Sequence, residues 1–250
     1  MVKITTSEAW IVPDWPAPEN VRSLVTTRAG GVSSGAYASL NLGDHVGDDP
    51  LAVAENRRRV AAGLPAPPQW LNQVHGTTVL DAGDSCAGQT PEADAAFARR
   101  SGVVCAVMTA DCLPVLLCDQ SGSVVAAVHA GWRGLRAGVL EQTVAAMACP
   151  GQQLLAWLGP AIGPTVFEVG DEVRDAFVAE NAQAEAAFTA LRPGKCLADI
   201  YLLARLALAR VGVTAVYGGN CCTVLDAQRF FSYRRDGATG RMASLIWLAD

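Results

Sequence analysis

The sequence predicts a single domain with a layered α+β fold. The chain has 250 residues, which is enough to bury one large core. Three apolar runs, at 103–109, 113–119 and 123–130, follow one another without a helix between them, and each has the length of a buried strand. Consecutive strands argue against a simple alternation of strand and helix. The helices are predicted elsewhere in the chain, so we expect them to lie in layers against the sheets.

The other elements are predicted from local signals. A turn-rich loop over 26–50 ends in Asp49 and Pro50, which are a favourable N-cap and first helical residue. The helix that starts there is expected to end at Gly63. Further helices are predicted at 135–148, 170–181 and 199–212, and further strands at 153–160, 213–218 and 242–249.

Composition limits the partners and the compartment. The net charge is −5 and no long run of lysine and arginine stands out, which disfavours nucleic acid and anionic membranes as partners. The first residues lack the apolar core of a signal peptide, and Asp111 and Pro114 interrupt the apolar stretch at 103–118. Eight cysteines without such a signal predict a cytoplasmic protein with free thiols. We expect one domain over 1–250, with about the first 20 residues peripheral, and a monomer by default.

Two of the three histidines and one cysteine form a candidate metal site. His129 ends an apolar strand just before a glycine-containing turn, and Cys112 lies between two apolar strands. His75 precedes a glycine in "LNQVHG". Two imidazoles and one thiolate are a donor set of catalytic zinc, with water in the fourth position. Asp111 is costly to place beside a core, so it is predicted to orient a histidine, to hold a polar loop or to act as a general base.

The same residues allow two other interpretations. Cys112 paired with His129 or His75 would be a nucleophile and its base, as in thiol hydrolases. Alternatively the three residues would hold copper, with Met108 as a weak axial ligand. A site with several coppers needs more than the three histidines that the chain contains.

Three arginines in "FFSYRRDGATGR" form a second candidate site. Arg234, Arg235 and Arg241 surround a tight turn, and arginine can grip phosphate or carboxylate with two parallel hydrogen bonds. The alternative is a solvated hairpin with surface charge. The neighbouring aromatic residues are candidates for stacking on a base or sugar, or for the core: Phe230, Phe231 and Tyr233.

A series of long motifs resembles a known family. In order along the chain these are "SLNLGDHVGDDPLAVAENRRR", "WLNQVHG", "TADCLPVLL", "AAVHAGWRG", "LGPAIGP" and "CCTVLDAQRFFSYRRDGATGRMASLIWL". Together they resemble the bacterial laccase-domain proteins, also called the multicopper polyphenol oxidase or purine nucleoside phosphorylase family, which includes the peptidoglycan editing factor. The resemblance implies an α/β/β/α sandwich of mixed sheets. It also implies zinc held by His75, Cys112 and His129.

The resemblance further implies an activity. The family's activity is phosphorolysis of adenosine, inosine and methylthioadenosine, with adenosine deamination as a further reaction. The alternatives are amide hydrolysis that removes a wrongly added L-serine from a UDP-MurNAc cell-wall precursor, and copper-dependent phenol oxidation. His45 and Cys222 also fall on family motifs.

For phosphorolysis, we expect four residues to contact the substrates. Arg133 or Arg234 would hold phosphate together with the glycine turn at 131–134, and Asn41 and Asn72 would bond hydroxyl groups. The expected partners are therefore a small nucleoside and phosphate.

Overall fold

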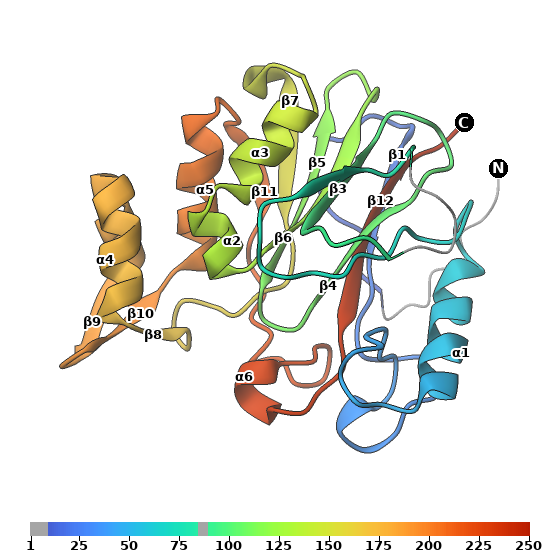
Figure 1. The fold of residues 1–250 in the computed structure, drawn as a ribbon, viewed down its shortest axis with the longest axis horizontal. Helices are drawn as coiled ribbons and strands as arrows, with labels where there is room; N and C mark the ends of the chain where they lie inside the picture. The colour runs from blue at the N-terminus through green and yellow to red at the C-terminus, as the bar shows by residue number, and fades with distance from the viewer. Residues whose placement is uncertain (1–9, 85–89) are drawn as a thin grey trace.

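The computed structural model describes residues 10–84 and 90–250. Two sheets packed face to face form the centre of the molecule (Figure 1). The larger has six strands in the order β11-β7-β5-β6-β3-β2: Ala215–Gly218, Leu154–Leu158, Leu113–Asp119, Val125–Ala130, Ala95–Ala98 and Val79–Asp81. The smaller has the order β1-β12-β4: Val21–Val25, Met242–Leu248 and Cys105–Thr109.

Helices cover both outer faces of this pair of sheets. The outer face of the six-stranded sheet packs against α2, α3 and α5, which span Trp132–Arg136, Val139–Ala146 and Ile200–Arg210. On the opposite side, α1 (Pro50–Ala61) packs through Val60 against the smaller sheet. The layers are therefore α/β/β/α, and the expected layered α+β fold is confirmed.

Alternating side chains on the strands join the layers. Along β5, Val115 and Leu117 pack toward the helices, while Leu116 and Cys118 pack toward the smaller sheet. Successive side chains of a strand point to opposite faces, so a strand that is buried on both sides reads as a continuous apolar run. This explains why β5 and β6 were recognisable in the sequence.

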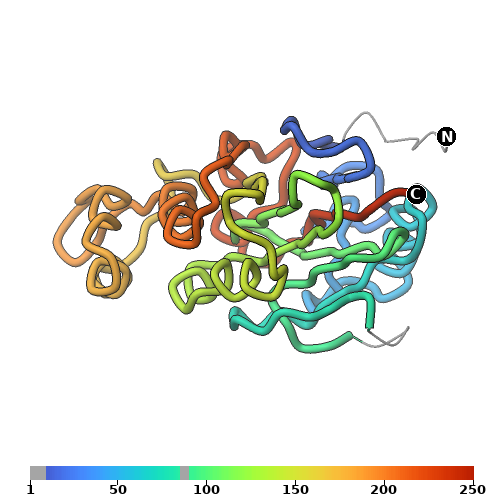
Figure 2. Tube along the Cα trace, turned by 90° about the horizontal axis from the view of Figure 1, so that it is seen from above, coloured from blue at the N-terminus to red at the C-terminus, as the bar shows by residue number. Residues whose placement is uncertain are grey.

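A third sheet lies at one end of the sandwich. It has the order β8-β10-β9 and is accompanied by α4 (Asp171–Glu180); its strands span Glu168–Gly170, Lys195–Ala198 and Phe188–Arg192. Figure 2 shows this orange segment projecting from the end of the molecule opposite the C-terminus. Its strands are short and mostly polar or exposed, which is why the apolar patterns in the sequence did not predict them.

Two further features of the fold have local causes. The helix predicted at 135–148 is divided into α2 and α3, because Gly138 has a φ of 93° that ends the first helix. The sequence did not assign the three consecutive apolar runs to particular sheets, and the structure divides them: β4 pairs with β12, and β5 pairs with β6. The crossover between the two sheets passes through Asp111, which has a φ of 95°.

The N-terminal segment is partly integrated into the sandwich. Residues 1–9 of the predicted peripheral segment lie outside the described residues. Beyond them, the Ile11 N–H donates to the Val25 carbonyl at 2.9 Å, and Trp15 packs against the core between the sheets. No helix in the described part of the chain combines the length and apolar character needed to cross a membrane.

Candidate metal centre

The fold brings His75, Cys112 and His129 together. Cys112 lies at the crossover between β4 and β5, His129 lies near the end of β6, and His75 lies in the loop before β2. One potential ligand atom from each residue lies within 4.8 Å of the other two. The Cys112 Sγ is 3.7 Å from the His75 Nε2, and the two imidazole rings are edge to face with centroids 4.8 Å apart. Sequence positions up to 54 residues apart therefore form one compact group (129 − 75).

A buried carboxylate orients the group. Asp94 is fully buried, and its carboxylate lies 2.7 Å from the His129 Nδ1. The same carboxylate accepts the backbone N–H groups of His75 and Gly76 at 3.0 and 2.6 Å, so it also fixes the loop that carries His75. Burial raises the pKa of Asp94, but the hydrogen bonds from His129 and from these N–H groups outweigh it and the pKa is lowered. An ionised Asp94 accepts the Nδ1–H of His129 and leaves Nε2 free for a metal ion.

A glycine makes room for the ligands. A Cβ at Gly131 would lie 2.7 Å from the His75 Cδ2 and 3.0 Å from the Cys112 Sγ. Gly134 likewise allows close approach, since its Cβ would lie 2.9 Å from the Gly76 carbonyl oxygen. His75 itself has a φ of 61°, an uncommon conformation for a residue with a side chain. The tight turns of "VHAGWRG" and "QVHG" are thus needed to bring the three ligands together.

The electrostatics of the group favour a thiolate. Burial disfavours ionisation of Cys112, but the charge of His129 and hydrogen bonds from His129 and His75 lower its pKa to about 6. Burial also disfavours the charged form of His129, but the Cys112 thiolate and Asp94 raise its pKa to about 9. Thiolate and imidazole are the forms that bind metals, so metal binding would release the His129 proton. The donors fit a metal ion such as zinc or copper.

The group lies in the wall of a large pocket. The cavity has a volume of about 790 Å³, within the range of small-molecule sites. Besides the three ligands, its lining includes four basic side chains: Arg133, Lys195, Arg234 and Arg241. His45 and Gln73 also line it. The family-motif histidine at 45 therefore reaches the site.

The predicted contacts divide into two groups. Arg133 and Arg234 line the pocket as expected. Asn41 does not: it is fully buried, and its amide bonds the loop backbone and Asp48. Asn72 is exposed and its backbone pairs with Glu92 beside the Asp94 segment. Asn41 is therefore corrected from a substrate contact to a support of the surrounding loop, whereas a substrate contact by Asn72, which is not among the lining residues, stays a prediction.

Asp111 lines the pocket, but it does not orient a histidine. One carboxylate oxygen accepts the Thr223 hydroxyl at 2.5 Å, and the other accepts the Arg234 backbone N–H at 2.6 Å. The orienting role expected of Asp111 belongs to Asp94. Asp94 was missed because a single aspartate before the alanine-rich β3 gives no pattern in the sequence; only its burial identifies it. Gln73 was missed for a similar reason: its amide bonds the Met108 backbone at 2.7 and 2.8 Å.

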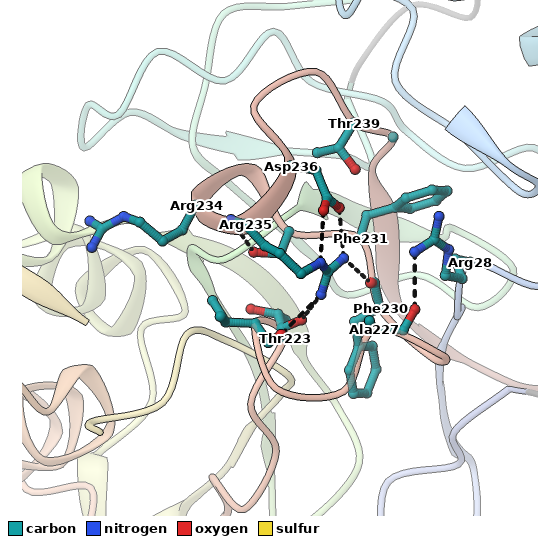
Figure 3. Close-up of polar contacts among 12 residues, drawn as sticks. Arg28, Thr223, Ala227, Phe230, Phe231, Arg234, Arg235, Asp236 and Thr239 are labelled. Carbon is teal, nitrogen blue, oxygen red and sulfur yellow. Dashed lines mark hydrogen bonds and ion pairs between the residues drawn. The ribbon is translucent and has the colours of Figure 1, made fainter. Parts of the chain in front are cut away.

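The arginine motif separates into two roles. Figure 3 shows the Arg235 guanidinium surrounded by acceptors, with Arg234 pointing away from them. Arg235 donates to Asp236 at 2.7 and 2.8 Å and to backbone carbonyls of Thr223 and Phe230 at 2.8 and 3.0 Å. Arg235 therefore stabilises the local fold by linking α6 to the segment that precedes it. Tyr233–Asp236 form the short helix α6 rather than a hairpin, and Phe230 and Phe231 are core residues.

The sulfur atoms of Met108 and Cys222 have structural partners. The Met108 sulfur, proposed above as an axial copper ligand, lies 3.8 Å from the Arg57 Nη2. The Cys222 Sγ accepts the Gly163 N–H at 3.3 Å, and a Cβ at Gly163 would lie 3.0 Å from the Cys222 Cβ. Cys222 thus packs against the loop that follows β7.

The sandwich, the His–Cys–His group and the pocket beside it define a domain with a candidate metal site in the wall of a large cavity. The family described as multi-copper polyphenol oxidoreductase laccase matches residues 22–249, so the chain belongs to this family, as its motifs suggested.

Two named relatives are similar in sequence to this chain over nearly the full length of both chains. The chain is 60% identical to a purine nucleoside phosphorylase of Pseudomonas aeruginosa over 97% of this chain and 99% of the relative. It is 57% identical to purine nucleoside phosphorylase YfiH of Escherichia coli (strain K12), over 95% and 98% of the two chains.

Solved structures share the fold. A crystal structure of a Neisseria meningitidis protein is 57% identical, has a TM-score of 0.94, and covers 97% of this chain and 100% of its own. YlmD from Geobacillus stearothermophilus is 31% identical with a TM-score of 0.85, and 96% of each chain is covered.

Proposed function

We propose that this protein is a metal-dependent purine nucleoside phosphorylase that cleaves adenosine, inosine and methylthioadenosine. The observation that carries the proposal is the shared wall of the pocket, where the His–Cys–His group lies among four basic side chains. Such a pocket suits a nucleoside and phosphate together. The names of the relatives from Pseudomonas aeruginosa and Escherichia coli support the same activity.

Phosphorolysis replaces the glycosidic C–N bond at the anomeric carbon of the sugar with a C–O bond to phosphate. A phosphate oxygen forms a bond to the anomeric carbon, and the glycosidic C–N bond breaks with its electron pair going to the purine, which then takes a proton. Basic side chains in the pocket wall bind the phosphate. Trp132, Phe167 and Tyr233 also line the pocket, and aromatic side chains there can pack against the purine. The Glu172 carboxylate, also in the wall, can accept hydrogen bonds from ribose hydroxyls.

Zinc is the metal we propose for His75, Cys112 and His129. Two imidazoles and one thiolate leave a fourth position open, as in catalytic zinc sites. Zinc there would supply positive charge and Lewis acidity. Copper is the alternative metal, but only two of the chain's histidines belong to the group, too few for a multicopper centre. Deamination of adenosine is a further reaction that such a zinc site would support.

The other properties we propose follow from the pocket and the cysteines. We also propose that the protein is a monomer that takes a small nucleoside and phosphate in this pocket. The described cysteines are free thiols, which fits the cytoplasm.

Product analysis tests the proposal. Zinc-loaded protein is incubated with adenosine, with and without inorganic phosphate, and the products are identified by mass spectrometry. We expect adenine and ribose 1-phosphate only when phosphate is present, and inosine would report deamination. Cys112→Ala should lose both metal and activity, whereas Cys149→Ala, outside the pocket lining, should keep both. Unchanged adenosine in the presence of zinc and phosphate would overturn the proposal.

A further inference from the structure

Arg241 differs from most arginines of the protein in its partners. Among residues 10–84 and 90–250, it forms no ion pair with a carboxylate. Its Nη1 donates to the carbonyl oxygens of Thr239 and Gly240 at 3.0 and 3.1 Å. Nine other arginines are paired with carboxylates: Arg57, Arg58, Arg59, Arg136, Arg174, Arg192, Arg210, Arg229 and Arg235. A pocket guanidinium that lacks such a partner is available to an anionic ligand.

The chain holds the Arg241 side chain firmly in place. Its backbone N–H donates to the Asn41 Oδ1 at 2.9 Å, and its carbonyl accepts the Leu42 N–H at 3.2 Å. Its Cγ would lie 2.8 Å from a Cβ at Gly43, so the aliphatic part of the side chain packs directly on that glycine. A preorganised arginine loses little freedom when it binds a ligand. The buried Asn41 thus supports a pocket residue instead of touching substrate.

The metal ligands lie within the electrostatic reach of Arg241. Burial lowers the pKa of its guanidinium, and the negative charges of Cys112 and Asp111 oppose that shift. The other pocket arginines also form no ion pair among the described residues, but they are more exposed and their guanidinium groups lie against aromatic rings. Arg133 is exposed and stacks on Trp132 at 4.6 Å, while Arg234 stacks on Phe167 at 5.6 Å and donates to the Glu168 carbonyl at 2.9 Å. Arg241 therefore combines partial burial, anchoring and an unpaired charge.

We propose that Arg241 is the residue that binds the phosphate co-substrate beside the His–Cys–His group. The planar guanidinium offers two parallel N–H donors to a phosphate, with Nη1 anchored by the backbone. The proposal rests on the proposed phosphorolysis for its role in catalysis, but binding of inorganic phosphate tests it directly. Arg133 and Arg234 are left to contact other parts of the substrates.

The test measures phosphate affinity and the kinetics separately. Inorganic phosphate is titrated into zinc-loaded protein by isothermal titration calorimetry, for the wild type and for Arg241→Gln, Arg241→Lys, Arg133→Gln and Arg234→Gln. Loss of a charged hydrogen-bond donor should weaken binding roughly ten- to hundredfold in Arg241→Gln. Arg241→Lys keeps the positive charge but loses the two parallel N–H donors of the guanidinium. Its affinity for phosphate should therefore lie between those of the wild type and Arg241→Gln. The exposed Arg58→Gln is the matched control and should bind phosphate as the wild type does.

Kinetics separates Arg241 from a general role in the fold. We expect Arg241→Gln to raise the KM for phosphate at least about tenfold while the KM for adenosine changes less than about twofold. Thermal melting of each variant shows whether it is folded. Wild-type phosphate affinity in folded Arg241→Gln, a larger loss in Arg133→Gln or Arg234→Gln, or a wild type that binds no phosphate would each overturn the proposal. If the wild type binds phosphate through Arg241 but leaves adenosine unchanged, the binding site stands and the proposed phosphorylase activity falls.

Discussion

At the residue scale, the buried carboxylate of Asp94 positions two of the three candidate metal ligands. It joins His129 of β6 to the backbone of the His75 loop. In Asp94→Asn the amide would present an N–H where the carboxylate accepts one. We expect metal affinity to fall roughly 10- to 100-fold and the free energy of unfolding to fall by about 2 kcal/mol. Competition with a chromophoric chelator measures the affinity.

An aspartate on the surface supplies the control for this experiment. Asp175 pairs with Arg174 at 2.9 Å and its side chain is 65% exposed, so Asp175→Asn should leave metal affinity unchanged. Full zinc affinity in Asp94→Asn would show that the hydrogen bond to His129 does not support the ligand.

Gly131 tests the space around the ligands. Its φ of −61° is open to any residue, so an alanine there meets no backbone penalty. The added Cβ would nevertheless collide with the His75 ring and crowd the Cys112 sulfur. We expect Gly131→Ala to remain folded by circular dichroism and to lose most of its zinc in metal analysis. A zinc content equal to that of the wild type would mean that the ligands rearrange at little cost.

The sequence revealed the ligands better than their supports. His75, Cys112 and His129 were recognisable by residue type and by their places at strand ends or turns. Asp94 and Asn41 could not be recognised in this way, because the role of a buried polar side chain depends on the atoms that surround it in the folded chain. The structure is therefore needed to separate Asn41, which supports Arg241, from the residues that line the pocket.

At the scale of elements, the turn between β5 and β6 depends on Asp119. Its carboxylate accepts the Ser123 and Val124 N–H groups at 2.6 and 3.0 Å and the hydroxyls of Ser121 and Ser123. Burial raises the pKa of Asp119, but these hydrogen bonds outweigh it and the pKa is lowered. The ionised group therefore stabilises the folded state more than the unfolded state.

The pH dependence of stability tests this turn. Asp119→Asn should lower the free energy of unfolding by about 2 kcal/mol at neutral pH. The wild-type advantage is fully present above the unfolded pKa of about 3.9 and is lost as pH falls through the lowered pKa of the folded state. Urea unfolding of both proteins over this range of pH measures the difference. A difference that stays constant at acid pH would mean that the charge of Asp119 is not its source.

Elements were predictable where one pattern decides the structure. The helix over 50–61 has an Asp49 side chain that accepts the Leu51 N–H at 2.9 Å, as its N-cap predicted. Strand β12 is buried at every position and was likewise found. Strand β3 is four residues rich in alanine, and β8 to β10 are exposed or short, so neither propensity nor periodicity marks them.

At the scale of the molecule, the layers could be predicted but the crossover could not. Local patterns identify β4 and β5, yet no pattern shows that the chain passes from one sheet to the other between them, at Asp111 with its φ of 95°. That crossover brings Cys112 next to His75 and His129. The molecule carries a net charge of −5, and its pocket lining combines four basic side chains with the carboxylates of Asp111, Glu168 and Glu172, so an anion there is held by local basic groups and not by the net charge.

Metal binding should stabilise the whole molecule, because its ligands come from three separate segments. A ligand that binds only the folded state stabilises it by about 2.7 kcal/mol at a hundredfold excess over its Kd. For a chain of this size, that corresponds to a rise in Tm of roughly 5 to 10 °C. We expect zinc to raise the Tm of the chelator-treated wild type and of Cys149→Ala, whose substitution lies outside the ligand group. Cys112→Ala should show little or no rise. An equal rise in Cys112→Ala would place the stabilising zinc elsewhere on the protein and would contradict the assignment of the three ligands.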